Sequence, residues 1–405
     1  MASTSSSTDT RENVGVGVTY WSAEVGPYVW HEFDADRTRA ELQAMADFGI
    51  RVVRTLLPWD AFMPSPSRIE ARRLRDVETL LAIAEGASLH VIPVLFAQSI
   101  GDCIMLPAYA IDVSAPRRDV RVVTDAVLQP GGPRDQYTDP VMIDSALSWL
   151  DGMLRAFAGH TALQAWDVGH DPARTMRPRR IDDMRRWLGM MSARIREHGE
   201  RCTLTLGTAD IVTARGVRPG VLATALDACG VEIDPALLHS GAGLDARATV
   251  FIAQLTQRLL GEPVPLTAGV YAVQEQQPSQ NVSSADRGDH ADAYARDCID
   301  ALVEHGCAAI HASAWAHSGA RAAAVPPVDR FPSLALRGLV DISGSPTRFG
   351  AGWRARTARE LERRPPTPWP DVLDVEDYYA NLPESVTDLH AMWEGGVSDD
   401  PGMLS

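Results

Sequence analysis

Short apolar runs alternate with longer amphipathic stretches along most of the chain. The runs are rich in β-branched residues, which is typical of buried parallel strands. The stretches between them repeat apolar residues at the spacing of a helix that buries one face. The predicted strands are 14–20, 51–57, 90–96, 162–168, 202–207, 228–233, 264–270 and 308–315. The predicted helices include 37–48, 74–85, 141–157, 181–198, 249–260 and 289–305.

Strands that alternate with helices form a parallel sheet built from right-handed β-α-β units. The units between residues 14 and 360 predict a (β/α)8 TIM barrel with some long loops, because that α/β fold typically takes about 250 residues. A doubly wound open sheet is the competing interpretation. Residues 1–13 read as a disordered leader and 396–405 as a flexible tail. The Pro-rich segment 361–395 is expected to form a strap with a docking helix near 384–393.

The charge balance excludes several classes of partner and chemistry. The 405 residues contain 53 acidic and 38 basic residues, which gives a formal charge of -15. Such a chain is a poor partner for nucleic acid or an anionic membrane, since phosphate binding needs a basic surface. Every basic residue is arginine, so Schiff-base, pyridoxal phosphate and Walker-type sites, which need a lysine amine, are excluded. Compositional bias of the coding genome accounts for the lack of lysine, and the exclusion holds whatever its cause.

The cysteines and the apolar segments point to a cytoplasmic protein. Five cysteines are scattered without a C-x-x-C pair, which argues against a disulfide framework or a thiolate zinc site. The polar first residues lack the apolar core of a signal peptide, and no run approaches the roughly 18 apolar residues of a membrane span. We therefore expect no cofactor, no bound metal and no membrane partner.

In a barrel of this kind, chemistry lies at the carboxyl ends of the strands. Tryptophans gather at these ends, at Trp21, Trp59 and Trp315. Indole rings stack on the apolar faces of sugars, and they also plug barrel mouths. Each tryptophan alone favours a plug, whereas the group with its polar neighbours favours a sugar-binding cleft.

Several segments resemble one known family in the same order along the chain. They are GVTYW, FGIRVVRTLLPWDAFMPSPSRIE, HVIPVLFAQ, DQYTDP, LQAWDVGHDP, AWAH and GLVDISGSPTR. Together they are similar to the clan A retaining glycoside hydrolases, specifically the cellulase and β-mannanase-like barrels, over about residues 14–395. The resemblance implies two catalytic glutamates, one acid/base and one nucleophile, about 5–5.5 Å apart.

The catalytic positions that the resemblance implies are altered in this chain. The family's acid/base motif, Asn-Glu-Pro after the fourth strand, corresponds here to His170-Asp171-Pro172, so Asp171 is one methylene shorter. A displacement of about 1 Å can cost about 100-fold in rate. The nucleophile position on the seventh strand falls on Thr267 or Ala268, neither of which is a carboxylate. Double-displacement hydrolysis is therefore expected to be lost.

Other positions retain the family's chemistry or replace it. Arg54 matches an arginine that holds the nucleophile in the family, and Trp315 matches its sugar platform. Glu232 and Asp234 stand on the sixth strand, where the family has a His-x-Tyr-like pair. Glu232 and Asp234 can form a repurposed catalytic pair, a pocket for a hard cation, or structural ion pairs with arginine.

We expect a carbohydrate-active barrel that binds a sugar or glycan as its partner, without double-displacement hydrolysis. An active O-glycosidase that uses Asp171 as acid/base and Glu232 or Asp234 as second carboxylate is one alternative. A protein-interaction scaffold with a filled cleft is the other. The predicted sugar contacts are Trp21, Arg54, Trp59, His170, Trp315 and His317.

Overall fold

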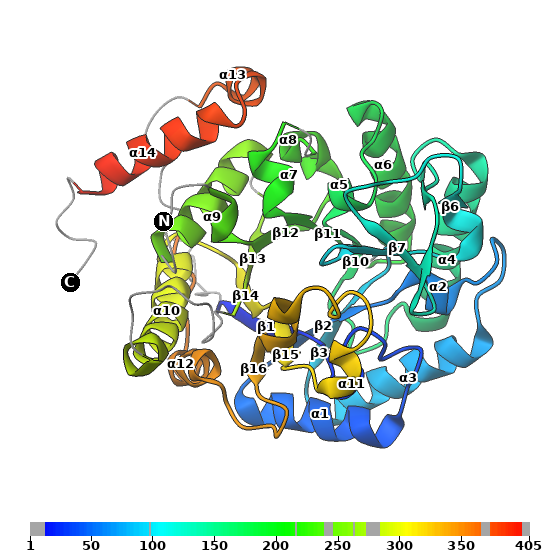
Figure 1. Cartoon of the computed structure of the whole chain (residues 1–405), viewed down its shortest axis with the longest axis horizontal. Coiled ribbons are helices and arrows are strands. Elements are labelled where there is room, and N and C mark those ends of the chain that lie inside the picture. The colour runs from blue at the N-terminus through cyan, green and yellow to red at the C-terminus, as the bar shows by residue number, and fades with distance from the viewer. Residues whose placement is uncertain are drawn as a thin grey trace, which may run out of the picture.

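Eight parallel strands close into a barrel, as the alternating pattern predicted. The computed structural model describes residues 13–96, 99–214, 217–238, 246–261, 264–272, 284–365 and 373–398. In Figure 1 the barrel strands lie at the centre and the helices form a ring around them. The strands are β1 (Gly15–Thr19), β2 (Val52–Leu56), β3 (His90–Val94), β10 (Trp166–His170), β11 (Cys202–Gly207), β12 (Ala228–Ile233), β13 (Leu266–Val270) and β14 (Ala309–Ala312).

The fourth and eighth barrel strands differ most from their predicted bounds. β1, β2, β3 and β13 differ by one or two residues at an end, and β11 and β12 match. Residue Leu163 makes only an isolated bridge to Val91, and the regular pairing of β10 begins at Trp166, so the strand runs on to His170. The eighth predicted run divides after Ala312. Its last part forms β15 (Ala314–Ala316), which leaves the barrel sheet and pairs with β16 (Gly338–Val340). Periodicity cannot show such a break, because apolar residues continue through it.

Long helices follow the barrel strands and cover the outside of the sheet. Capping residues define several of their ends. The Asp34 carboxylate accepts from the Arg37 backbone N–H at the start of α1, and the left-handed Gly49 ends that helix. Asp139 caps α4, whose first residue is Pro140. The long helices are α1 (Ala35–Phe48), α3 (Ala71–Gly86), α4 (Pro140–Phe157), α6 (Ile181–Glu197), α9 (Ala246–Leu260), α10 (Ser284–Glu304) and α12 (Arg348–Thr357).

Short elements line the loops between strands and helices. The short helices are α2 (Trp59–Phe62), α5 (Pro172–Thr175), α7 (Thr208–Val212), α8 (Pro219–Leu222) and α11 (Ala320–Ala323). The 3-10 turns are Ala108–Ala110, Ala223–Ala225, Pro235–Leu238 and Pro332–Leu336. Several of them follow barrel strands directly, so they belong to the face where the carboxyl ends of the strands meet.

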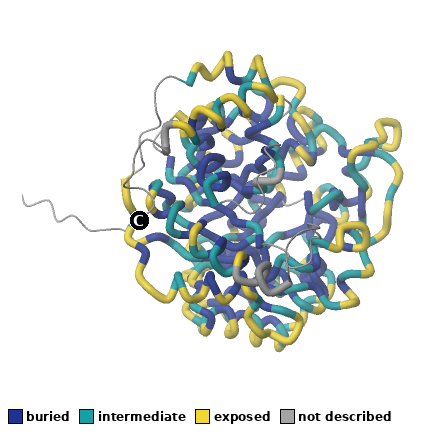
Figure 2. Tube along the Cα trace, turned by 60° about the vertical axis from the view of Figure 1, so that its left-hand side comes forward, coloured by how far each residue is buried: buried dark blue, intermediate teal, exposed yellow. Residues whose placement is uncertain are grey.

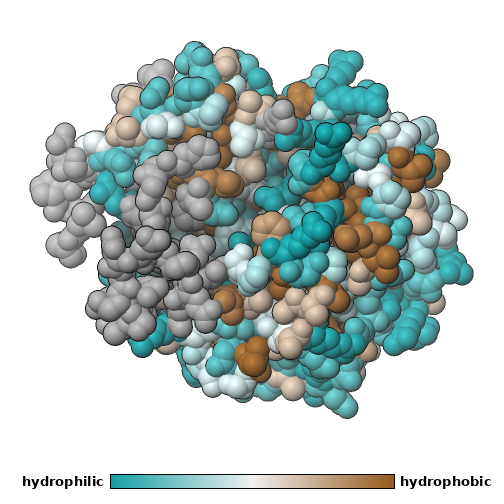
Figure 3. Space-filling model, viewed as in Figure 1, coloured by the Kyte–Doolittle hydropathy of each residue, from teal (hydrophilic) through white to brown (hydrophobic). Residues whose placement is uncertain are grey.

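An insertion between β3 and α4 forms small sheets that the periodicity did not predict. Arg121 anchors it, because its guanidinium pairs with Asp102 at 2.6 Å and with Asp329 at 2.8 Å. Hydrophilic residues dominate the face drawn in Figure 3, and apolar groups form separate patches on it. The strands of the insertion are β4 (Ser99–Ile100), β5 (Cys103–Met105), β6 (Ile111–Asp112), β7 (Arg121–Thr124), β8 (Val127–Gln129) and β9 (Gly132–Pro133).

Buried residues concentrate in the barrel and in the layer between the barrel and its helices (Figure 2). Most of them are apolar, and large side chains such as Trp149, Trp166 and Phe251 fill the layer under the helices. A few charged side chains, among them Arg54, Asp167 and Glu232, are buried with them. Buried charges need partners, so these residues mark the part of the barrel where specific chemistry is expected.

No helix of the described residues has the length and apolar character that a membrane crossing requires.

The chain after the barrel returns to its outer surface. The Val14 backbone N–H donates to Leu361 O at 2.7 Å, and beyond the undescribed residues 366–372 come α13 (Val375–Ala380) and α14 (Glu384–Ser398). Tyr378 donates its hydroxyl to Ile211 O at 2.9 Å. The predicted docking helix is thus contained in α14. The predicted leader, apart from residue 13, and residues 399–405 of the predicted tail lie outside the described residues.

Trp393 joins α14 to the barrel layer, where Figure 1 shows α14 beside α9. Its indole N–H donates to Gln254 Oε1 at 2.6 Å, and its ring lies 5.7 Å from that of Phe251. We expect Trp393→Ala to lower the free energy of unfolding by about 3 kcal/mol, because it removes a buried aromatic ring. Met392→Ala is the control, since that neighbouring side chain is 70% exposed, and it should stay within about 0.5 kcal/mol. Equal urea-unfolding curves for the two variants would contradict this docking.

Candidate functional site

A buried arginine binds two carboxylates inside the barrel. Arg54, on β2, donates from Nε and Nη2 to Asp167 Oδ2 at 3.1 and 2.9 Å, and from Nη1 to Glu232 Oε1 at 3.3 Å. Asp167 also accepts from the Thr205 hydroxyl at 2.7 Å and from the Gly169 backbone N–H at 3.0 Å. Asp167 is therefore fully engaged in holding the arginine. Asp167 was not selected from the sequence, although its place on the fourth strand, next to a matched motif, could have identified it.

Glu232 is the second partner of Arg54, and it remains ionised. Burial acts to raise its pKa, but the hydrogen bond and charge of His311 and the charges of His170 and Arg54 outweigh burial and lower the pKa to about 2. His311 Nε2 lies 3.3 Å from Glu232 Oε1. The other oxygen, Oε2, is buried and has no hydrogen-bond partner among the described residues. Glu232 thus presents a carboxylate oxygen whose hydrogen-bonding capacity is unused.

Gly269 makes room for the Glu232 carboxylate over the neighbouring strand. The register of β12 and β13 sets Glu232 opposite Gly269. A Cβ atom at Gly269 would lie 2.6 Å from Glu232 Oε2 and 2.9 Å from His311 Nε2. The carboxylate from the sixth barrel strand therefore occupies space that a side chain from the seventh would fill. Thr267 and Ala268, the predicted nucleophile positions, lie earlier in β13.

Asp171 follows β10 directly and has a left-handed backbone with φ 48°. Its Oδ2 pairs with Arg174 Nε at 2.7 Å, and its Oδ1 is buried without a hydrogen-bond partner. A Cβ atom at Gly207, on the next strand, would lie 2.6 Å from Asp171 Oδ1. Asp tolerates the left-handed region better than most residues. The glycine and this backbone conformation together hold the carboxylate of Asp171 at the strand ends, where the family motif predicted it.

Asp210 forms a second carboxyl group beside Asp171. It is fully buried in α7, where its Oδ2 accepts from the Gly207 backbone N–H at 2.9 Å and its Oδ1 lacks a partner. Burial, with a contribution from the negative charge of Asp171, raises the pKa of Asp210 to about 8. Asp210 is therefore protonated at neutral pH. The position of Asp210 after the fifth barrel strand can be read from the sequence. Its raised pKa cannot, because it results from burial in the folded protein.

The imidazole ring of His170 lies beside the Arg54 guanidinium. Its Nδ1 lies 3.4 Å from both terminal nitrogens of Arg54. Burial, with a further contribution from the charge of Arg54, lowers its pKa, although Glu232, Asp171 and Asp167 act in the opposite direction. A neutral imidazole can accept a hydrogen bond from the guanidinium, which is the role that this geometry allows.

The predicted sugar-stacking tryptophans are packed against protein. Trp59 is fully buried and stacks on Trp149 with ring centroids 5.9 Å apart. Trp315 lies in β15, where its ring meets the edge of Phe48 from α1 at 5.5 Å. Trp21 is buried and donates its indole N–H to Ser318 Oγ at 2.8 Å. In this structure these rings fill space as plugs, which is the alternative that each tryptophan favoured on its own.

The other predicted site residues lie at the edge of the group. The Asp234 backbone N–H donates to the Thr208 hydroxyl at 2.8 Å at the end of β12, and its side chain is half-buried. His317 follows β15, and its backbone N–H donates to Val340 O at 2.8 Å, outside the barrel sheet. Asp234 is thus brought near the carboxyl groups, whereas His317 belongs to the small β15–β16 sheet.

Tyr271 is a residue of the site that sequence analysis did not select. It follows β13, is half-buried, and has the Arg337 guanidinium 4.2 Å from its ring centroid. Burial raises its pKa, and the nearby charges of Glu232, Asp171 and Asp234 act in the same direction. The hydroxyphenyl group therefore lies within electrostatic reach of all three carboxylates. Applying the strand-end rule to the seventh strand would have found it.

A small cavity lies behind the fourth strand. Its lining includes Gly169 of β10, Thr175 of α5, and the polar side chains of Gln136 and Tyr137. Its volume of about 10 Å³ holds at most one water molecule. It is too small for a saccharide ring.

Asp210 makes stability depend on pH. Its pKa rises from 3.8 to about 8 on folding, so the folded protein keeps a proton that the unfolded chain releases. Its contribution to stability is complete below pH 3.8 and is lost as the pH rises to about 8. Asp210→Asn cannot ionise. Its free energy of unfolding relative to the parent should therefore increase between pH 5 and 9, by on the order of 2 kcal/mol. Thermal or urea unfolding at these pH values measures the difference.

Asp182→Asn, on the exposed side of α6, is the matched control and should differ from the parent by the same amount at every pH. A constant difference for Asp210→Asn would contradict the protonated state of Asp210.

Comparisons with known proteins support the fold. No protein-family model and no curated protein sequence matches the chain. A GH5_18 variant from Bifidobacterium longum subsp. longum ATCC 55813, in complex with Manβ1-4GlcNAc, matches with a TM-score of 0.76 and 14% identity over 95% of this chain and 89% of that chain. GH5_18 from Streptomyces cattleya in complex with GlcNAc matches with a TM-score of 0.72 and 18% identity, over 89% and 83%.

The exo-β-1,4-mannosidase Op5Man5 from Opitutaceae bacterium strain TAV5 matches with a TM-score of 0.70 and 20% identity, over 86% of this chain and 60% of that chain. Identities this low establish the fold alone, and the barrel that they share is the one that the sequence segments predicted. The chain therefore has a (β/α)8 barrel fold that is similar to the fold of these structures.

Proposed function

We propose that the protein binds a β-linked saccharide at the carboxyl ends of its barrel strands, without double-displacement hydrolysis. The observation that carries the proposal is a set of buried carboxyl oxygens that have no hydrogen-bond partner among the described residues: Asp171 Oδ1, Asp210 Oδ1 and Glu232 Oε2. A buried acceptor without a donor costs about 1–3 kcal/mol. Sugar hydroxyls both donate and accept hydrogen bonds, so they suit these oxygens whether or not the carboxyl group carries a proton.

The position of these atoms supports a ligand site. Asp171 follows β10, Asp210 follows β11, and Glu232 lies near the end of β12. These strands are neighbours in the barrel, and they end at the face where barrels of this fold place their ligands. Tyr271 adds an aromatic ring and a hydroxyl group beside them. The seventh strand supplies no carboxylate at Thr267, Ala268 or Gly269, which is why hydrolysis through a nucleophile on that strand is not part of the proposal.

The comparisons suggest which saccharide to test. The similar structures include complexes with GlcNAc and with Manβ1-4GlcNAc. A neutral disaccharide also suits an acidic protein better than an anionic ligand, because it avoids charge repulsion. Manβ1-4GlcNAc is therefore the first probe, with mannobiose and cellobiose as further β-linked candidates.

We expect saturable binding of at least one of these disaccharides by titration calorimetry at pH 7. Asp171→Asn should weaken it about fivefold, because a hydrogen bond to a carboxylate is stronger than one to a neutral amide oxygen. Asn tolerates the left-handed backbone at this position, so the variant should fold. Asp182→Asn, on the exposed side of α6, is the control and should bind like the parent. Absence of binding to all three disaccharides would contradict the proposal and favour the interaction-scaffold alternative.

Hydrolysis is a second candidate, and the position of Glu232 favours it. Its carboxylate is ionised, lies over Gly269 on the seventh strand, and contacts Arg54, the arginine that holds the nucleophile in the resembling family. Asp171 stands at the acid/base position, beside the protonated Asp210. A carboxylate from β12 could thus serve where β13 offers none.

A hydrolytic site predicts turnover of an aryl β-mannoside. Asp171→Asn and Glu232→Gln should each lower kcat by at least about 100-fold, because each would remove a group that takes part in bond cleavage. Asp234→Asn tests the other candidate for the second carboxylate. The anomer of the product, followed by NMR, would distinguish a nucleophilic Glu232 from one that activates water. Turnover that is equal in the parent and in Asp171→Asn would contradict this mechanism.

A further inference from the structure

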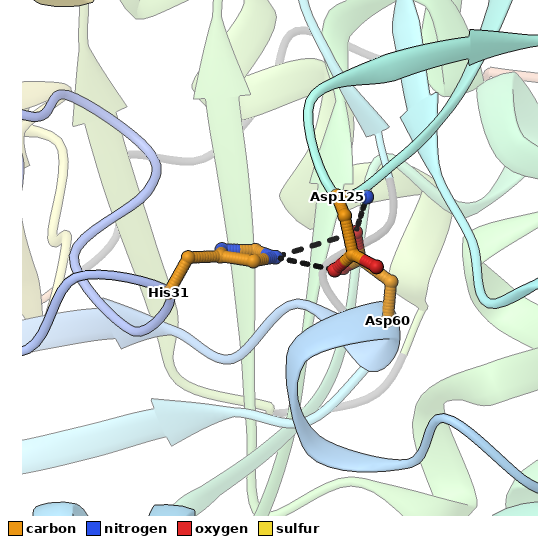
Figure 4. A group of neighbouring side chains, drawn as sticks. All are labelled: His31, Asp60 and Asp125. Carbon is orange, nitrogen blue, oxygen red and sulfur yellow. Dashed lines mark hydrogen bonds and ion pairs between the residues drawn. The ribbon is translucent and has the colours of Figure 1, made fainter.

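Three side chains from three separate loops converge outside the carboxylate group described above (Figure 4). His31 lies between β1 and α1, Asp60 lies in the first turn of α2 after β2, and Asp125 lies in the turn between β7 and β8 of the insertion. One ligand atom from each lies within 4.8 Å of those from the other two. We propose that these residues bind a divalent transition-metal ion, Zn²⁺ or Mn²⁺.

The distances fit a shared ion. His31 Nε2 lies 3.4 Å from Asp60 Oδ2 and 3.6 Å from Asp125 Oδ1. Ligand atoms about 2.1 Å from a zinc ion at the tetrahedral angle lie about 3.4 Å apart. The observed separations are longer than ordinary hydrogen bonds, but they match this spacing. Figure 4 shows the imidazole edge directed at the two carboxylates.

The imidazole of His31 lies beside the Asp60 and Asp125 carboxylates without forming a hydrogen bond to the described residues. Both ring nitrogens are buried, and neither makes a hydrogen bond to the described residues, although the side chain as a whole remains 15% exposed. A buried nitrogen without a hydrogen bond is costly. A metal ion would engage Nε2 directly, and a water molecule or further ligand could reach the site from the exposed side.

The Asp60 carboxylate is held in place before any ion binds. Asp60, whose side chain is 0% exposed, accepts at Oδ1 from the Ala61 backbone N–H at 3.1 Å and at Oδ2 from the Asp125 backbone N–H at 3.0 Å. These bonds fix one carboxylate and attach the turn of the insertion to α2. Tyr28 meets the His31 ring at an edge, with centroids 5.2 Å apart. The arrangement therefore limits the reorganisation that binding would require.

The ligand types select the class of ion. Ca²⁺ and Mg²⁺ prefer oxygen ligands throughout, whereas an imidazole nitrogen with two carboxylates suits Zn²⁺ or Mn²⁺. Asp125 is 71% exposed at its side chain, so coordination positions on that side stay open to water. The bound ion would join the loops after β1 and β2 to the β7–β8 turn and so fix the insertion against the barrel. No bound metal was predicted from the sequence, so a metal ion at this cluster would differ from that prediction.

The test is a titration of the chelator-treated full chain with ZnCl2, and with MnCl2, by calorimetry and thermal unfolding. We expect one saturable site per chain and a Tm that rises with the metal concentration. Asp125→Asn should lower the affinity at least tenfold and abolish the rise in Tm at the same metal concentration. The turn residue has a left-handed φ of 48°, which Asn also adopts, so this variant should keep the fold.

Asp119→Asn is the matched control, because Asp119 belongs to the same insertion but pairs with Arg117 and lies outside the cluster. It should bind metal like the parent. A parent without saturable binding of either ion would overturn the proposal. Equal binding by the parent and Asp125→Asn would also overturn it, because the metal would then lie elsewhere.

Discussion

The burial of the Arg54 guanidinium inside the barrel is the constraint on which the rest of the site depends. A cation cannot be removed from water without closely placed negative groups. Asp167 meets the guanidinium through two nitrogens, and Glu232 meets it through the third. The strands β2, β10 and β12 are thereby joined by charge across the barrel. Any function at the strand ends has to leave this balance intact.

The same constraint explains how a carboxylate can occupy the space over the seventh strand although that strand carries none. The carboxylate of Glu232 lies over Gly269, because Arg54 and His311 contact it there and the glycine has no Cβ atom to fill that space. The ionised Glu232 and the protonated Asp210 then differ in charge for one reason. Both groups are buried, but the cationic and hydrogen-bonding partners of Glu232 outweigh burial, whereas burial and a negative neighbour dominate at Asp210. Proteins use such opposed pairs of carboxyl groups to divide acid and base roles.

The predicted sugar-stacking tryptophans are buried within the protein. Tryptophans that could have faced a ligand are packed against Trp149, Phe48 or Ser318. The proposed ligand site therefore rests on the buried carboxyl oxygens and Tyr271, and not on these tryptophans. The insertion after β3 adds a further element to the same face, since Asp125 brings its carboxylate to His31 and Asp60.

The sequence by itself determined the barrel, because each strand and helix leaves a local hydrophobic period that does not depend on the partner it finds. It also located Asp171 and Glu232, since the strand-end rule and the family motif are both properties of order along the chain. Only the tertiary structure decided that Asp167 meets Arg54, that Asp210 keeps a proton, and that Trp59 is a plug. It alone assembled His31, Asp60 and Asp125, which are far apart in sequence. Contacts of this kind depend on strand register and loop packing, and no local pattern of residues encodes either.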